Sequence, residues 1–159
     1  MLDKLDKQII GELEGNARRS YTDLAKVLEV SEGTIRNRVK NLQKSDVIKL
    51  EAVLNPYSIG YDFITVMALE VKVADLSIVS DMLVKLPNIY YLAYVTGRYD
   101  IVAIVMTRST QELAEFIKQH ISNIPSILHC ETLVNLEVVK SPWTHNASVN
   151  QLINMIPND

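Results

Sequence analysis

The sequence contains little cysteine and no long apolar run, and each shortage excludes a class of protein. Cys130 is the single cysteine among 159 residues, so no disulfide can form within the chain, and a reducing compartment is expected. No uninterrupted apolar stretch approaches the length of a membrane span. The charged start of the chain, Met1-Leu2-Asp3-Lys4, lacks the apolar core of a signal peptide. These absences predict a cytoplasmic protein with no membrane partner.

Patterns for catalysis or metal binding are scarce as well. The sequence has no Gly-rich phosphate loop, no Ser/His/Asp order and no paired-carboxylate motif. His129 and Cys130 are neighbours in an expected strand and would point to opposite faces. His120 and His145 have no partner at the spacing of metal ligands. The sequence therefore predicts no catalytic residue, no metal site and no cofactor.

Charge is nearly balanced overall but unevenly distributed along the chain. The net charge is −3, with 48% hydrophobic and 22% charged residues, a composition typical of a folded soluble protein. Residues 1–52 carry ten Lys and Arg against nine Asp and Glu, and the remainder carries six against ten, so the two nets are +1 and −4. The basic excess lies in the N-terminal third, and phosphate binding depends on local cation density rather than on overall charge.

Residues 20–42 have the pattern of two short helices joined by a tight turn. Ser20 is an N-cap with Asp23 at the third helical position, and Ser31 caps the second helix. The residues at buried helical spacing are Leu24, Ala25 and Leu28 in the first helix and Ile35, Val39 and Leu42 in the second. An amphipathic helix carrying Leu2, Leu5, Ile9 and Leu13 precedes the pair. Together these three helices predict a helix-turn-helix DNA-binding domain over residues 1–50.

The second helix of the pair would expose side chains that can contact DNA. Arg can take guanine and Asn adenine in bidentate contacts, Thr can reach a base edge, and Lys neutralises phosphate. The candidate DNA-binding residues are Ser31, Thr34, Arg36, Asn37, Arg38, Lys40 and Lys44. A charged helix face is often only a solvated surface, but the preceding capped helix and turn favour a surface for double-stranded DNA.

The rest of the chain alternates strand-like and helix-like stretches. After a short extended linker at 51–61, strands are expected at 63–73, 89–96, 100–107 and 127–139, and helices at 76–86 and 110–123. This βαββαβ order predicts a ferredoxin-like α+β domain over residues 62–140, with both helices on one face of a four-stranded antiparallel sheet. A tail at 141–159 follows. A shift of 38 residues aligns Pro87 with Pro125 and the helices before them, which supports two related halves.

The other face of such a sheet is left bare. Both alternating sets of strand residues are largely apolar, as shown by Val66, Ala68, Leu92, Tyr94, Val102, Ile104 and Val134. A large exposed apolar face predicts association, and helix-turn-helix proteins usually bind two half-sites as dimers. Alternatively, the linker or the tail covers this face within one chain.

With these elements in place, the chain resembles the Lrp/AsnC, or feast/famine, family of transcription regulators of bacteria and archaea. The resemblance extends from Leu2 to about Lys140. Its motifs are Leu5-Asp6 with Ile9-Ile10, Ser31-x-x-Thr34-Ile35-x-x-Arg38-Val39-x-x-Leu42, Val47-Ile48, Asn55-Pro56-x-x-x-Gly60, Gly97-Arg98-Tyr99-Asp100, and Ile124-Pro125-x-Ile127 leading to Thr132 and Lys140. The resemblance implies a winged-helix-type DNA-binding domain, joined by a linker strand to an effector domain that forms homodimers and higher oligomers such as octamers.

The resemblance also implies a small-molecule effector, an amino acid or a similar metabolite, bound between subunits. The Gly-x-x-Asp loop of the family corresponds here to Gly97, Arg98, Tyr99 and Asp100, and the matching part of the last strand is Thr132, Leu133, Val134 and Asn135. Gly97 would let backbone approach a ligand closely, and Asp100 would accept from an α-ammonium group. The same four residues also make a good hairpin connection. Asn135 occupies a position that is usually an apolar residue in the family. Its amide either contacts a polar side chain of the effector or faces solvent.

Three positions depart from the glycine that is usual in the family, and they hold Glu29, Asp46 and Ser126. Because Glu adopts a positive φ less readily than Asp, strain or an altered turn is expected at Glu29. Two other functions fit the architecture. One is a sirohaem-decarboxylase-like enzyme, which would need a cationic, histidine-bearing pocket, and the other is an architectural protein that compacts DNA. The function expected from the residues is an effector-responsive, sequence-specific regulator and not an enzyme.

Overall fold

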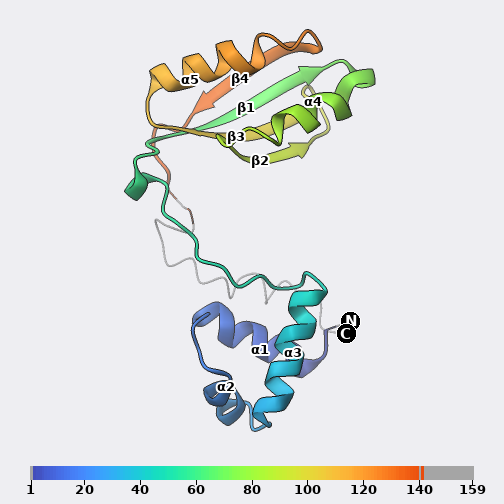
Figure 1. Cartoon of the computed structure of the whole chain (residues 1–159), viewed down its shortest axis with the longest axis vertical. Coiled ribbons are helices and arrows are strands. Elements are labelled where there is room, and N and C mark those ends of the chain that lie inside the picture. Colours follow the sequence, from blue (N-terminus) through green and yellow to red (C-terminus); the bar gives the residue numbers. More distant parts are fainter. Residues whose placement is uncertain (1, 140, 142–159) are drawn as a thin grey trace. The chain divides into compact units, whose positions relative to one another are not determined.

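The chain folds into two compact units whose boundary falls between Val53 and Leu54. The computed structural model describes residues 2–139 and 141, and Figure 1 shows the elements of both units. The predicted tail at 141–159 lies outside the described residues except for Ser141. Among the described residues, no helix has the length and apolar character that crossing a membrane requires.

The described part of the first unit consists of three helices, as predicted. They are α1 (Lys4–Gly15), α2 (Tyr21–Val27) and α3 (Glu32–Lys44). Each begins at a side-chain cap, from Asp3, Ser20 and Ser31 respectively, which satisfies backbone N–H groups left unpaired in a first helical turn. The core of the unit is formed by Ile9, Ile10, Leu13, Leu24, Ala25, Ile35, Val39 and Leu42.

Two non-glycine residues in this unit adopt left-handed backbone conformations. Glu29 has a φ of 54° and Asp46 a φ of 53°. Each follows a helix whose C-terminus closes with a bond from the next residue, Val30 N–H to Ala25 O (3.0 Å) and Val47 N–H to Leu42 O (2.9 Å). The turns therefore keep the geometry that glycine favours, although the side chains differ.

The predicted linker strand is not formed within the chain. Residues 48–55 are neither helix nor strand, and only a short 3-10 turn, η1 (Tyr57–Ile59), precedes the second unit. A strand needs a partner for its backbone N–H and C=O groups, and the described chain offers none along this stretch. For the same reason no strand follows α3 to make a wing. Within the described residues of one chain, the linker is irregular backbone.

The second unit has the predicted βαββαβ order. Its elements are β1 (Phe63–Val71), the turn η2 (Val73–Asp75), α4 (Leu76–Leu83), β2 (Ile89–Tyr94), β3 (Ile101–Thr107), α5 (Thr110–Phe116), a π-helical turn η3 (Ile117–Ile121) and β4 (Ile127–Val134). The sheet order is β2-β3-β1-β4, and all neighbours are antiparallel. The ferredoxin-like prediction is confirmed. The last strand is shorter than expected, because β4 ends at Val134 rather than at residue 139.

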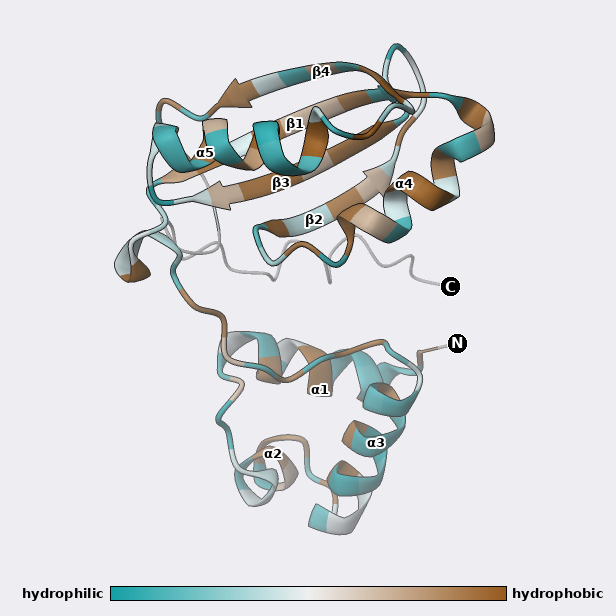
Figure 2. Ribbon diagram, turned by 45° about the horizontal axis from the view of Figure 1, so that its top comes forward, coloured by the Kyte–Doolittle hydropathy of each residue, from teal (hydrophilic) through white to brown (hydrophobic). Residues whose placement is uncertain are grey.

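Both faces of this sheet are apolar. One face packs with α4 and α5 in a core that includes Met67, Leu69, Ile101, Leu83 and Phe116. The pairing registers place Val66, Ala68, Val102 and Ile104 on the opposite face. Figure 2 shows the consequence, since β1 and β3 are coloured as hydrophobic along most of their length.

Candidate DNA interface and effector loop

Helix α3 carries three of the candidate DNA-binding residues, Asn37, Lys40 and Lys44, on the side away from its core. A turn of 3.6 residues places Asn37 almost diametrically opposite the buried Ile35, Val39 and Leu42. Asn37, Lys40 and Lys44 are exposed. The helix thus presents an amide flanked by cations, and the sequence has no acid from Arg36 to Lys44. This arrangement suits base contacts at the centre and phosphate contacts at the flanks.

The first turn of α3 is organised by hydrogen bonds within the domain. Ser31 Oγ accepts from Thr34 N–H at 3.1 Å and lies 2.8 Å from Thr34 Oγ1. The Ser31 side chain therefore acts as the N-cap of α3. Thr34 remains partly exposed.

Arg36 is held against the neighbouring helix α2. Its guanidinium donates to Glu32 Oε1 at 2.7 Å and lies 5.6 Å from the centre of the Tyr21 ring. Thr22 Oγ1 donates to the other oxygen of Glu32 at 2.8 Å. The hydrogen bond from Thr22, followed by that from Arg36, lowers the pKa of Glu32. Because 63% of the Arg36 side chain is exposed, it can exchange the surface pair with Glu32 for a phosphate at little cost.

Arg38 is engaged inside the domain. Its Nη1 donates to Asp3 Oδ2 at 2.5 Å and to Asp6 Oδ1 at 3.2 Å. The two aspartates also form the capping box of α1, in which Asp6 N–H donates to Asp3 Oδ1 at 2.8 Å. The backbone bond from Asp6 is the main cause of a lowered pKa at Asp3, with Arg38 adding to it. Arg38 therefore links α3 to the start of α1, a role that was not expected.

The Gly97–Asp100 loop is a tight connection between β2 and β3. Gly97 has a φ of 118°, which explains the glycine. Asp100 N–H donates to Leu69 O at 2.9 Å, and Asp100 Oδ2 accepts from Val71 N–H at 2.8 Å. The carboxylate thus fastens the loop to the end of β1. This role in closing the hairpin uses one of the two carboxylate oxygens of Asp100.

Side chains of the loop lie over β4. The Tyr99 hydroxyl donates to Glu131, and its ring stacks on His129 with the ring centres 6.2 Å apart. The Arg98 guanidinium lies over the same ring, 5.3 Å from its centre. The hydrogen bond to Glu131 raises the pKa of Tyr99. Glu131 and His129 were missed from the sequence, because only strand pairing brings them to the loop.

Two of the predicted effector residues, Asp100 of the loop and Asn135 of the last segment, lie at opposite ends of β1 within one chain. The loop is bonded to Leu69 and Val71 at the end of β1, whereas Asn135 N–H donates to Ile64 O near its start. Leu69 and Ile64 are five positions apart along β1, about 17 Å at the usual rise per residue. Thr132 pairs with Met67 between these points. Within the described residues, no three His, Cys, Asp or Glu side chains gather as a possible metal site.

The fold and the exposed face of α3 define a two-domain helix-turn-helix protein, and comparisons with known proteins identify its family. An AsnC-type helix-turn-helix domain matches residues 2–43, and the PF0864 C-terminal dimeric alpha+beta barrel domain matches residues 63–148. An HTH-type transcriptional regulator of Pyrococcus furiosus is 37% identical over 88% of this chain and 95% of its own. The regulator Ptr1 of Methanocaldococcus jannaschii is 32% identical over 88% and 95%. The chain belongs to the Lrp/AsnC family of DNA-binding transcriptional regulators.

Solved structures agree with this assignment. E. coli AsnC superposes with a TM-score of 0.83 at 32% identity, over 89% of this chain and 96% of its own. The regulator NMB0573 of Neisseria meningitidis, solved as a complex with L-Met, has a TM-score of 0.81 over 96% and 99%. Its identity is 20%, so this likeness is one of fold.

Proposed function

We propose that this regulator binds DNA sequence-specifically through α3 and that an amino acid or similar small molecule, bound between subunits, changes its assembly or its DNA affinity. The observation that carries the DNA-binding part is the position of Asn37. It is an exposed amide at the centre of the helix face, flanked by Lys40 and Lys44, with the apolar residues of α3 on the far side. An amide so placed can pair with adenine in the major groove.

The effector part is supported by the geometry of the second unit. Within one chain the Asp100 carboxylate sits at the end of β1, whereas Asn135 pairs with its start, so a ligand held by both of these residues is expected where two chains meet. Asp100 keeps one carboxylate oxygen for such a ligand, and an α-ammonium group is a fitting donor. The L-Met complex of the Neisseria protein motivates the choice of amino acids as first candidates.

DNA binding by the full chain tests the proposal. Fluorescence anisotropy would compare the protein's own promoter with a random duplex of equal length, with and without each of the twenty amino acids. Asn37→Ala should weaken promoter binding by about tenfold while leaving random-duplex binding nearly unchanged, since one base contact is worth about 1–3 kcal/mol. Gln43→Ala serves as the control. Gln43 is also an exposed amide residue of α3, but it lies off the helix face that carries Asn37 and closer to the apolar side of the helix.

Two results would reject parts of the proposal. If Asn37→Ala loses affinity equally for the promoter and for the random duplex, base readout by Asn37 is rejected. Equal affinity and salt slope for promoter and random DNA in the unsubstituted protein would favour a DNA-compacting protein instead. A thermal-shift screen of the same amino acids identifies the effector independently of DNA, because a ligand raises the unfolding temperature by mass action.

A further inference from the structure

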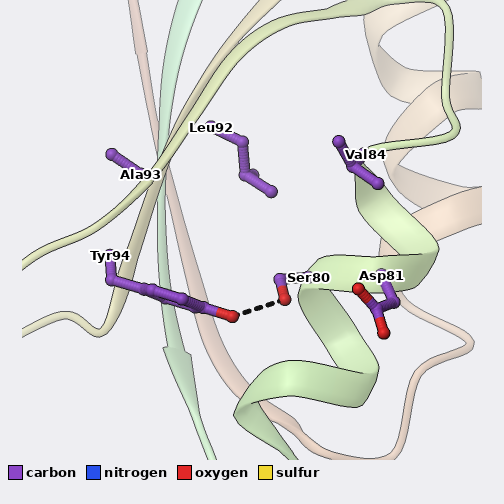
Figure 3. A pocket seen from close by; sticks show the side chains of 6 residues that line it. All are labelled: Ser80, Asp81, Val84, Leu92, Ala93 and Tyr94. Atoms are coloured by element: carbon purple, nitrogen blue, oxygen red, sulfur yellow. Dashed lines mark hydrogen bonds between the residues drawn. The ribbon is translucent and has the colours of Figure 1, made fainter.

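A pocket lies between helix α4 and the edge strand β2, and neither the DNA face nor the effector loop includes it. Its volume is about 220 Å³, and it is lined by Ser80, Asp81, Val84, Leu92, Ala93 and Tyr94. Figure 3 shows Tyr94 reaching from β2 toward Ser80 on α4, with Leu92 and Val84 on the two walls above them. The pocket therefore joins an apolar upper part to a polar base.

The direction of the hydrogen bonds at the base can be worked out. Ser80 Oγ donates to Ser77 O at 2.9 Å, and this uses its only hydrogen. The contact of 2.6 Å between Ser80 Oγ and the Tyr94 hydroxyl must then have Tyr94 as the donor. The hydroxyl hydrogens of Ser80 and Tyr94 are thus both used in hydrogen bonds within the protein. What the Tyr94 oxygen can still offer to the pocket is a lone pair.

The remaining polar side chain of the pocket is also an acceptor. Asp81 is exposed at the rim, and an ionised carboxylate has no hydrogen to donate. Within residues 2–139 it has no ion pair or hydrogen bond, and Lys85, four positions further along the chain in the turn after α4, does not pair with it. The lining thus combines acceptors, a negative charge that no described residue neutralises, and the apolar side chains of Val84 and Leu92.

We propose that this pocket binds a small aliphatic amine in its protonated form. The ammonium group donates to the Asp81 carboxylate and to the Tyr94 oxygen, and the alkyl part lies against Val84 and Leu92. An aliphatic amine is charged at neutral pH, because its pKa is close to that of lysine, about 10.4. A free amino acid fits poorly, because its carboxylate would face Asp81 and find no donor. The proposal is independent of the effector loop.

The test uses the full-length protein and three ligands of similar shape. Isoamylamine carries the charge, isoamyl alcohol lacks it, and leucine adds a carboxylate. Isothermal titration should find saturable binding of isoamylamine and none of isoamyl alcohol at the same concentrations. Any heat from leucine should be the same in the unsubstituted protein and in Asp81→Asn, since leucine would bind elsewhere.

Two substitutions locate the binding. Asp81→Asn keeps the shape of the pocket and removes the charge, so affinity for isoamylamine should fall about tenfold or more. Tyr94→Phe removes the second acceptor and should weaken binding several-fold. Asp62→Asn is the matched control, because Asp62 is an exposed aspartate of the same unit away from the pocket. It should bind the amine as the unsubstituted protein does.

Three outcomes would overturn the proposal. One is equal affinity of Asp81→Asn and Asp62→Asn for isoamylamine, and another is equal binding of isoamyl alcohol. The third is an absence of isoamylamine binding by the unsubstituted protein. If Asp81→Asn then also has a lower mass by light scattering, a basic side chain of a second copy fills the pocket. Promoter binding and the amino-acid response are measured separately, so failure of the amine site leaves the proposed function standing.

Discussion

Arg38 on α3 and Asp6 on α1 are joined across 32 residues of sequence by a hydrogen bond of 3.2 Å from Nη1 to Oδ1. Asp6 is buried, with 11% of its side chain exposed. The same carboxylate accepts from Asp3 N–H at the start of α1. One aspartate therefore caps the N-terminus of α1 and joins this helix to α3.

We expect Asp6→Asn to lower the free energy of unfolding of the first unit by about 1.5–3 kcal/mol, the usual range for losing a hydrogen bond to a charged group. Chemical denaturation followed by helix circular dichroism measures this. Asp46→Asn replaces an exposed aspartate of the same unit and should change little. Equal stability of the two variants would contradict the role given to Asp6.

This link also changes what an Arg38 substitution can report. Removing Arg38 takes away the cationic partner of Asp6, so a loss of DNA binding could come from a lost base contact or from a less stable domain. Asn37 has no such contact among the described residues, which makes it the cleaner probe. The Asp3-x-x-Asp6 pattern is a readable capping signal, but its connection to Arg38 depends on how α1 packs on α3, and local sequence does not encode that.

Glu29→Gly should stabilise the protein. Glu29 holds a φ of 54°, where a side chain costs about 1–2 kcal/mol, and the entropy of a freer unfolded chain offsets part of the gain. We expect a net gain of about 0.5–1 kcal/mol, seen as a higher Tm. Asp46 has nearly the same φ, but Asp46→Gly should raise the stability less, because Asp tolerates this backbone conformation better than Glu. A lower Tm for Glu29→Gly would show that its side chain makes a stabilising contact.

The sequence predicted these turns and most of the fold because their causes are local. Serine caps, helical spacing and the βαββαβ order depend on neighbouring residues, and Ser20, Ser31 and the sheet topology follow the prediction. Features that depend on tertiary geometry were not predictable. A register shift between Ile89 and Tyr91 places both Ile89 and Leu92 toward the helices, against simple alternation. The contact of Tyr99 with Glu131 also requires the sheet to be known.

Ile104→Glu should reduce the mass of the assembly. Ile104 pairs with Val66 of β1 and lies on the sheet face opposite the helices, and the matched domain type is dimeric. A carboxylate at the centre of an apolar interface cannot keep its hydration, so the associated state is disfavoured by several kcal/mol. Light scattering measures the mass. Val73→Glu charges an apolar residue that is 81% exposed and should leave the mass unchanged. An unaltered mass for Ile104→Glu would reject this face as the contact between chains.

Asp100→Asn separates the two roles of the effector loop. The amide oxygen of asparagine can still accept from Val71 N–H, which Asp100 Oδ2 now does at 2.8 Å, while the negative charge that would bind an α-ammonium group is lost. We expect the fold and basal DNA binding to persist and the affinity for the effector found in the amino-acid screen to fall about tenfold or more. Asp100→Ala removes both roles and should lower the Tm in addition. If the effector titration of Asp100→Asn matches that of the unsubstituted protein, the carboxylate only closes the hairpin, and the effector must be bound by other residues.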